Sequence, residues 1–220
     1  MDLTFDCYGT LLDTRAIRNW FLKISQQNNL DGQAAWHQFE SWEDRLMYGE
    51  PTLPYLVLLK RNLAYIDMTL KTGTLFSDQL SQLIAAYQAL EPWPEVVTTL
   101  RQLRLAGNWV ILMSNSTPEL MTAHLKSLGH QVDQVILPEQ TGCYKPEIKF
   151  FKYAAQQVSH DHIHVAMGYW WDVIPCRKMG WPVVWINRNG LTAFADNQPT
   201  ATLPNLTGLP KFIQQFSESN

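Results

Sequence analysis

The sequence has few cysteines and no pair of them close together. The three that it contains, Cys7, Cys143 and Cys176, are far apart and form no C-x-x-C motif. An odd number of widely spaced cysteines argues against a disulfide framework and against a zinc site. It is also typical of a protein from a reducing compartment.

The sequence also lacks an excess of basic charge and a long hydrophobic run. Its formal net charge is -3, which gives no basic surface for nucleic acid. No apolar run approaches the length of a membrane span, and a strand is expected from Leu3, which leaves no room for a signal peptide. We therefore expect a cytoplasmic protein without nucleic-acid or membrane partners, in which local cations would attract any small anionic substrate.

The hydrophobic pattern divides the 220 residues into a main domain and an insertion. Between residues 15 and 90, apolar residues such as Ile17, Phe21 and Ile24 recur at helical spacing. Turn-forming residues near positions 28–32, 50–54 and 72–74 break this region into about four helices. We expect residues 15–90 to be a helical cap domain, and residues 1–14 and 91–220 to form the core domain.

The core domain alternates between predicted strands and helices. Strands are expected at the N-terminus and near residues 109–113, 134–137, 164–167 and 182–186. Helices are expected near residues 96–107, 118–128, 146–158 and 172–179, and after a loop near 209–216. This alternation predicts an α/β fold with a doubly wound, Rossmann-like parallel sheet.

Polar residues gather where the predicted strands end. In a parallel sheet, ligands bind outside the carboxyl ends of the strands, and these ends carry Asp6 with Tyr8 and Thr10, Ser114 with Asn115, Lys145, and Gly168 to Asp172. Asp6 is a candidate nucleophile, with the amides and hydroxyl of Gly9, Thr10 and Leu11 as candidate donors to developing charge. The alternative interpretation is that Asp6 only caps the segment that follows it.

Several motifs together resemble those of one enzyme family. Phe5-Asp6-Cys7-Tyr8-Gly9-Thr10-Leu11, Met113-Ser114-Asn115, Tyr144-Lys145-Pro146, Trp171-Asp172 and Trp185-Ile186-Asn187-Arg188 are similar, in order and interval, to motifs of the haloacid dehalogenase superfamily. Tyr8 favours the L-2-haloacid dehalogenase branch, because the phosphatases of the superfamily carry a second aspartate there. The resemblance implies a cap over the active site, no cofactor, and a homodimer.

The resemblance also implies a mechanism and roles for the site residues. Asp6 would displace halide from C2 of a short L-2-halo acid, and water would then hydrolyse the aspartyl ester to give a 2-hydroxy acid. Lys145 would hold Asp6 ionised by lowering its pKa. Thr10 would orient Asp6, Ser114 and Asn115 would bind substrate carboxylate or halide, and Asp172 would position water or Lys145. Each role has a structural alternative. Ser114, Asn115 and Asp172 could instead cap helices. Lys145 could lie at a solvated helix terminus, and Tyr8 could simply pack under the cap.

The sequence departs from the dehalogenase pattern at three places, one of which is Phe151, where the family has a tyrosine in the helix after the lysine. Met167-Gly168-Tyr169 stands where the family has Ser-Ser-Asn, and no clear arginine matches the cap residue that contacts the halide, for which His37, Arg45 and Arg61 are candidates. One alternative function is a Mg²⁺-dependent phosphatase, although the usual metal aspartate falls on Gly168. Another is a catalytically inactive relative that binds a ligand through its aromatic-rich cap.

Overall fold

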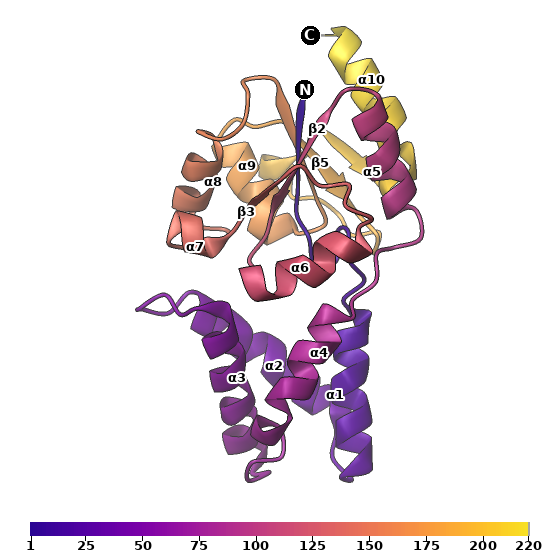
Figure 1. The fold of residues 1–220 in the computed structure, drawn as a ribbon. Helices are drawn as coiled ribbons and strands as arrows, with labels where there is room; N and C mark the ends of the chain where they lie inside the picture. Colours follow the sequence, from indigo (N-terminus) through magenta and orange to yellow (C-terminus); the bar gives the residue numbers. More distant parts are fainter. Residues whose placement is uncertain (220) are drawn as a thin grey trace. The chain divides into compact units, whose positions relative to one another are not determined.

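The computed structural model describes residues 1–219, which divide into two compact units (Figure 1). One unit contains residues 1–13, 91–115 and the chain from Leu125 onward. The other contains Thr14–Leu90 and also Ser116–His124. The second unit therefore includes a short segment, outside residues 15–90, that helical periodicity alone does not assign to it.

The first unit is built on a six-stranded sheet in which every neighbouring pair of strands is parallel. The strand order is β3-β2-β1-β4-β5-β6. The strands are β1 (Asp2–Phe5), β2 (Trp109–Met113), β3 (Gln134–Ile136), β4 (His162–Ala166), β5 (Val183–Ile186) and β6 (Ala201–Leu203). This confirms the predicted α/β fold with a doubly wound sheet.

Helices cover both faces of this sheet. In Figure 1, α8 (Ile148–Ala154) and α9 (Ile174–Lys178) lie against one face, and α5 (Val96–Leu105) and α10 (Leu209–Ser219) against the other. Phe150 and Phe151 of α8 pack with strand residues such as Ile111 and Val183 in a core that excludes water. Parallel strands covered on both faces are apolar along their whole length, which explains why Trp109–Met113 and Val183–Ile186 contain few polar residues.

Residues 15–90 of the second unit contain four α-helices, in line with the prediction of about four. These are α1 (Arg15–Gln27), α2 (Gly32–Met47), α3 (Tyr55–Leu70) and α4 (Leu80–Gln88). The ring centroid of Phe21 lies 4.7 Å from that of Phe39 and 5.9 Å from that of Phe76, and all three side chains are buried. The aromatic residues of the insertion thus form its own core, as the helical spacing indicates. The first part of α6 (Pro118–Ser127) joins this unit, where His124 Nε2 lies 2.9 Å from the carbonyl oxygen of Tyr87.

Three local predictions were wrong. β6 was expected to be loop, because a three-residue edge strand that is only partly buried has no hydrophobic run to mark it. The short helix α7 (Pro138–Thr141) was also missed. The helix expected near residues 172–179 begins instead with a π-helical turn, Tyr169–Val173, before α9.

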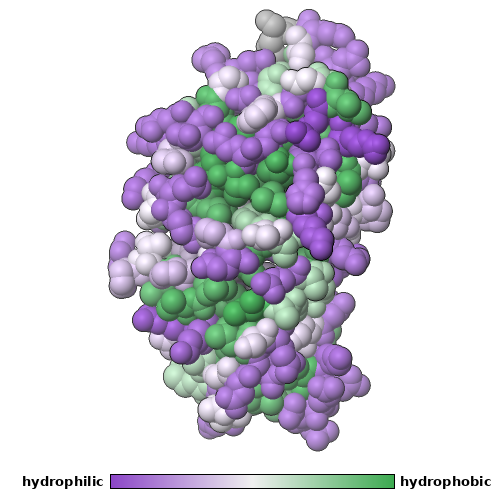
Figure 2. Space-filling model, in the orientation of Figure 1, coloured by the Kyte–Doolittle hydropathy of each residue, from purple (hydrophilic) through white to green (hydrophobic). Residues whose placement is uncertain are grey.

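One face of the molecule shows how polar and apolar residues are distributed on the surface. Hydrophilic residues cover much of the face in Figure 2, and hydrophobic residues show through in patches. None of the helices within residues 1–219 combines the length and the apolar character needed to span a bilayer.

Candidate active site

Asp6 lies directly after β1, at the carboxyl end of a central strand. Its N–H donates to the carbonyl oxygen of Val165, so the β1–β4 ladder extends one residue beyond the strand. The tight turn that follows uses its own amides, because Gly9 N donates to Leu12 O and Leu11 N donates to Cys7 O. The expectation that the Gly9 and Leu11 amides are donors to developing charge is therefore corrected: these amides close the turn.

Thr10 holds one oxygen of the Asp6 carboxylate. Its hydroxyl donates to Asp6 Oδ2 at 2.5 Å and accepts a hydrogen bond from Met167 N at 2.7 Å. Gly9 allows the turn to approach β4 closely, since its φ is +78° and a β-carbon there would lie 2.6 Å from Met167 Cε. Thr10 is therefore fixed from both sides and orients the carboxylate.

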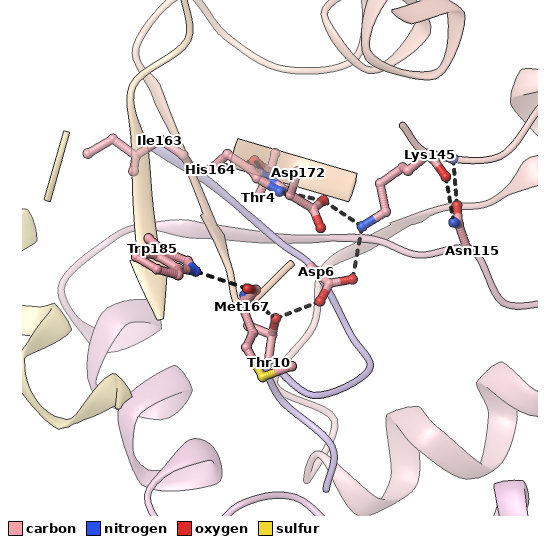
Figure 3. Close-up of polar contacts among 10 residues, drawn as sticks. All are labelled: Thr4, Asp6, Thr10, Asn115, Lys145, Ile163, His164, Met167, Asp172 and Trp185. Carbon is pink, nitrogen blue, oxygen red and sulfur yellow. Dashed lines mark hydrogen bonds and ion pairs between the residues drawn. The ribbon is translucent and has the colours of Figure 1, made fainter. Parts of the chain in front are cut away.

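Lys145 holds the other oxygen of Asp6. The Lys145 ammonium lies 2.9 Å from Asp6 Oδ1 and 2.6 Å from Asp172 Oδ1, as Figure 3 shows. The residue is 1 % exposed, so the alternative of a solvated helix terminus does not hold. Although burial disfavours the ammonium, the two carboxylates outweigh it and raise the pKa of Lys145.

The two carboxylates of the site differ in electrostatics. Burial raises the pKa of Asp6, and the charge of Asp172 adds to the rise, although Lys145 opposes it. The predicted lowering by Lys145 is therefore present, but burial outweighs it. Burial also acts on Asp172, but the charge of Lys145 and a contact with His164 hold the pKa of Asp172 below its ordinary value. The site thus keeps Asp172 as the more strongly ionised acid.

Asn115 and Ser114 follow β2 at the same edge of the sheet. The Asn115 side chain forms two hydrogen bonds with the main chain of Lys145: its Oδ1 accepts from Lys145 N at 2.7 Å, and its Nδ2 donates to Lys145 O at 2.9 Å. Ser114 is buried, and its N–H donates to Ile136 O. The amide of Asn115 is therefore used to position Lys145, a role that the sequence did not suggest.

The remaining predicted residues are Tyr8, His37 and Arg45. Tyr8 is half-buried in the turn after Asp6. His37 and Arg45 lie on α2, where His37 Nδ1 is 3.5 Å from Glu40 Oε2 and Arg45 donates to Ser41 Oγ at 2.6 Å. Their roles in substrate binding stay predictions.

Three residues to which the sequence assigned no role support the site, and one of them, Arg188, stood only as part of a family motif. His164 Nε2 lies 3.0 Å from Asp172 Oδ1, and His164 Nδ1 lies 2.8 Å from Thr4 Oγ1. Arg188 donates to the carbonyl oxygens of Gly9 and Thr10 and so holds the turn from the outside. A polar residue inside an otherwise buried strand was the available indication for Thr4 and His164.

The residues present do not fit the magnesium site of the related phosphatases. Mg²⁺ needs a near-octahedral set of oxygen ligands, whereas both Asp6 and Asp172 are bonded to Lys145. A β-carbon at Gly168, where the metal aspartate would stand, would lie 2.5 Å from Asp172 Oδ2. Within residues 1–219, no group of three or more His, Cys, Asp or Glu side chains is arranged to hold a metal ion.

The known proteins to which this chain is similar include several named as dehalogenases. The chain is 26 % identical over 200 residues to an (S)-2-haloacid dehalogenase from Pseudomonas sp. (strain YL), covering 86 % of this chain and 83 % of the relative. It is 26 % identical over 222 residues to haloacetate dehalogenase H-2 from Moraxella sp. (strain B), covering 96 % of both. The crystal structure of an L-2-haloacid dehalogenase, at 23 % identity, superposes with a TM-score of 0.83 and covers 97 % of this chain and 98 % of that one.

A family model agrees with these relatives and covers most of the chain. The model for haloacid dehalogenase-like hydrolases matches residues 3–167, from the first strand through Asp6, Asn115 and Lys145 to the end of β4. The chain belongs to the family of haloacid dehalogenase-like hydrolases.

Proposed function

We propose that the protein is a metal-independent 2-haloacid dehalogenase in which Asp6 is the nucleophile. The observation that carries the proposal is the buried Asp6–Lys145–Asp172 cluster, in which Lys145 bonds both acids and Gly168 leaves no place for a metal aspartate. The dehalogenase names of the relatives support the same reaction.

The first half of the reaction is a substitution at carbon. One Asp6 oxygen attacks C2 of a short L-2-halo acid, a carbon–oxygen bond forms, and the halide leaves with the electron pair of the carbon–halogen bond. Each carboxylate oxygen has two acceptor positions, so the contacts with Thr10 and Lys145 orient Asp6 and still leave it able to attack. Displacement from the opposite side inverts the configuration at C2.

The second half regenerates the enzyme. Water attacks the carbonyl carbon of the Asp6 ester, and the bond breaks between that carbon and the former Asp6 oxygen now attached to C2. The 2-hydroxy acid leaves with that oxygen and one proton is released, so the oxygen from water stays on Asp6. Lys145 faces the developing charge on the Asp6 carbonyl oxygen and stabilises it. Asp172 either positions the water or holds Lys145 in place.

Other parts of the proposal concern the second unit and the whole molecule. Residues 15–90 act as the cap domain, and His37 and Arg45 contribute to binding of the carboxylate or the halide; alanine substitution of either should raise the KM for the halo acid. The protein forms a homodimer in solution, and light scattering can measure this oligomeric state. It is located in the cytoplasm.

Isotope labelling gives the decisive experiment. Wild-type protein, treated with EDTA, is given less than one equivalent of L-2-chloropropionate in ¹⁸O water. The expected result is chloride release, an unlabelled 2-hydroxy acid, and ¹⁸O on Asp6 by peptide mass spectrometry. The Asp6→Asn variant is the control and should not release chloride at the wild-type rate.

Other results would reject the proposal. Direct incorporation of ¹⁸O into the product would show that water, and not Asp6, attacks C2. Hydrolysis of p-nitrophenyl phosphate that depends on Mg²⁺ would indicate a phosphatase. No turnover in either assay would favour a catalytically inactive relative.

A further inference from the structure

Two polar side chains lie deep in the sheet beneath the active site. Thr4 on β1 and His164 on β4 are both fully buried. They are partners in the parallel register of these strands, so their side chains lie next to each other on one face of the sheet. Since side chains alternate along a strand, Asp6 lies on the same face as Thr4, two residues further toward the site.

These side chains continue the hydrogen-bonded chain that begins at Asp6. From Asp6 Oδ1 the contacts run to Lys145 Nζ, to Asp172 Oδ1, to His164 and finally to Thr4 Oγ1, as Figure 3 shows. The hydroxyl of Thr4 also lies 3.3 Å from the carbonyl oxygen of Ile163, but its contact with His164 Nδ1 is shorter, at 2.8 Å. The series of hydrogen bonds therefore ends at the Thr4 hydroxyl.

The contacts of His164 fix where its hydrogen must be. Lys145 Nζ, which can only donate, bonds Asp172 Oδ1, so this oxygen is an acceptor. His164 Nε2 must therefore carry a hydrogen and donate it to Asp172, and Nδ1 then faces the Thr4 hydroxyl. Thr4 thus selects the orientation of the ring, as the outer partners of metal-binding histidines do.

The Asp172 carboxylate needs this second donor. Two carboxylates share the single ammonium of Lys145 in a buried site, and a buried charge without enough partners is costly. Asp172 lies within the π-helical turn Tyr169–Val173, and Gly168, the residue before this turn, lies close to its other oxygen. The donor at His164 fixes the position of Oδ1, to which Lys145 is also bonded.

We propose that His164, anchored by Thr4, is a positioning residue that holds Asp172 and, through it, keeps Lys145 against Asp6. This inference rests on the proposed function, and it adds His164 and Thr4 as residues that position the catalytic groups. It predicts an effect on turnover and little effect on substrate binding, because neither side chain is a partner of Asp6 itself.

Few other titratable groups face His164. Asp172 and, beyond it, Lys145 are the charged groups on its Nε2 side. On its own strand, His162 is the nearest titratable group; its ring packs at 4.4 Å on Trp181 and its Nδ1 lies 3.0 Å from Ser159 O. From α8, the ring of Phe151 lies edge-on at 6.3 Å. A change in pH profile after substitution of His164 would therefore report on the Asp172–Lys145 pair.

Substitution tests the proposal through turnover. His164→Leu removes both ring nitrogens and should lower kcat about 10- to 100-fold, as is typical when an outer partner of a functional group is lost, with KM within about twofold. His164→Gln can place an amide N–H near the position of Nε2 and should recover most of this loss. Thr4→Val should fall between the two, and Thr4→Ser should be close to wild type.

The pH profile separates positioning from simple packing. Asp6 and Asp172 share Lys145 and titrate as a pair, and the bond from His164 favours the ionised form of Asp172. The acidic limb of kcat, which reports ionisation of this pair, should therefore move to higher pH in His164→Leu and less in His164→Gln. His162→Gln is the matched control on the same strand and should keep the wild-type rate and profile. A wild-type profile in His164→Leu, or an equal loss of turnover in the Leu and Gln variants, would overturn the proposal.

Nitrogen NMR tests the same arrangement without any turnover. In ¹⁵N-labelled protein the signals of His164 are those lost in His164→Gln, and we expect a hydrogen on Nε2 whose shift changes in Asp172→Asn. An unprotonated Nε2 would overturn the positioning role. If wild type shows the protonated Nε2 but releases no halide, the dehalogenase proposal fails while the His164–Asp172 contact stands.

Discussion

The Lys145 ammonium lies 2.9 Å from Asp6 Oδ1, although 139 residues separate the two in sequence. Lys145 also bonds Asp172, so removing its charge leaves two buried carboxylates without a counter-ion. Breaking a buried ion pair by removal of one partner costs about 3–5 kcal/mol. Both the stability of the fold and the position of the proposed nucleophile therefore depend on the Lys145 side chain.

Lys145→Met should accordingly reduce both the rate of halide release and the stability of the fold. We expect halide release to fall by about 10²- to 10³-fold, the loss typical of one fixed group that stabilises developing charge. The free energy of unfolding at pH 7 should fall by about 3–5 kcal/mol, measured by urea denaturation. Lys149→Met, on the exposed side of the same region, is the control. Equal behaviour of the two variants would show that Lys145 does not interact with Asp6 in this way.

Gly168 is expected to tolerate no side chain. A β-carbon there would lie 2.5 Å from Asp172 Oδ2, so Gly168→Ala should displace the carboxylate and cost about 1–3 kcal/mol of stability by overpacking, with a clear loss of turnover. Gly208→Ala is the control, since its nearest neighbour would lie at an ordinary 3.5 Å. Gly168→Asp should not create Mg²⁺-dependent phosphatase activity, because Lys145 still bonds both acids. Thermal melts and the two activity assays measure these effects.

Arg188 should be specific for arginine because its flat guanidinium group makes several contacts at once. Its nitrogens donate to Gly9 O, Thr10 O and Glu95 Oε1, and its central carbon lies 4.4 Å from the centroid of the Trp93 ring. A lysine ammonium cannot reproduce this planar set of donors. We expect Arg188→Lys to lower stability by about 1.5–3 kcal/mol, the range for bonds to charged groups, and to reduce turnover by loosening the turn that holds Thr10.

A second arginine provides the control for that prediction. Arg104 pairs with Asp133 but has a side chain that is 37 % exposed, against 10 % for Arg188. Exposed ion pairs contribute about 0–1 kcal/mol, so Arg104→Lys should change the denaturation midpoint little and leave turnover unchanged. If the two substitutions had similar effects, the turn would not depend on Arg188.

The sequence predicted the convergence of Asp6, Thr10, Lys145 and Asp172 because a single rule applies: parallel strands bring their carboxyl ends to one edge. Contacts that depend on which strands are neighbours could not be predicted in this way. Thr4 and His164 meet only because β1 pairs with β4 in a particular register. The use of Asn115 for the main chain of Lys145 likewise depends on three-dimensional proximity between segments 30 residues apart.

The last prediction concerns Glu43 in the helical unit. Tyr55 donates to Glu43 Oε1 at 3.0 Å, but burial raises the pKa of Glu43 from its ordinary 4.5 to about 7. A pKa that is higher in the folded state stabilises the fold fully below the ordinary value, and this stabilisation is lost as pH rises through about 7. Glu43→Gln keeps an oxygen acceptor for Tyr55 but has no charge, so the variant should unfold with a smaller dependence on pH between 4.5 and 8.

At pH 8, Glu43→Gln should be more stable than wild type by up to about 3 kcal/mol, from roughly 1.4 kcal/mol for each unit of pKa shift, while at pH 4.5 the two should be close. Urea denaturation at several pH values measures this difference, with Glu50→Gln as an exposed control on the loop after α2. A parallel pH dependence of wild type and Glu43→Gln would mean that Glu43 is ionised in the folded protein at neutral pH. In that case Tyr55 and the surrounding helices would solvate a full negative charge, and the core of the helical unit would be more polar than its burial indicates.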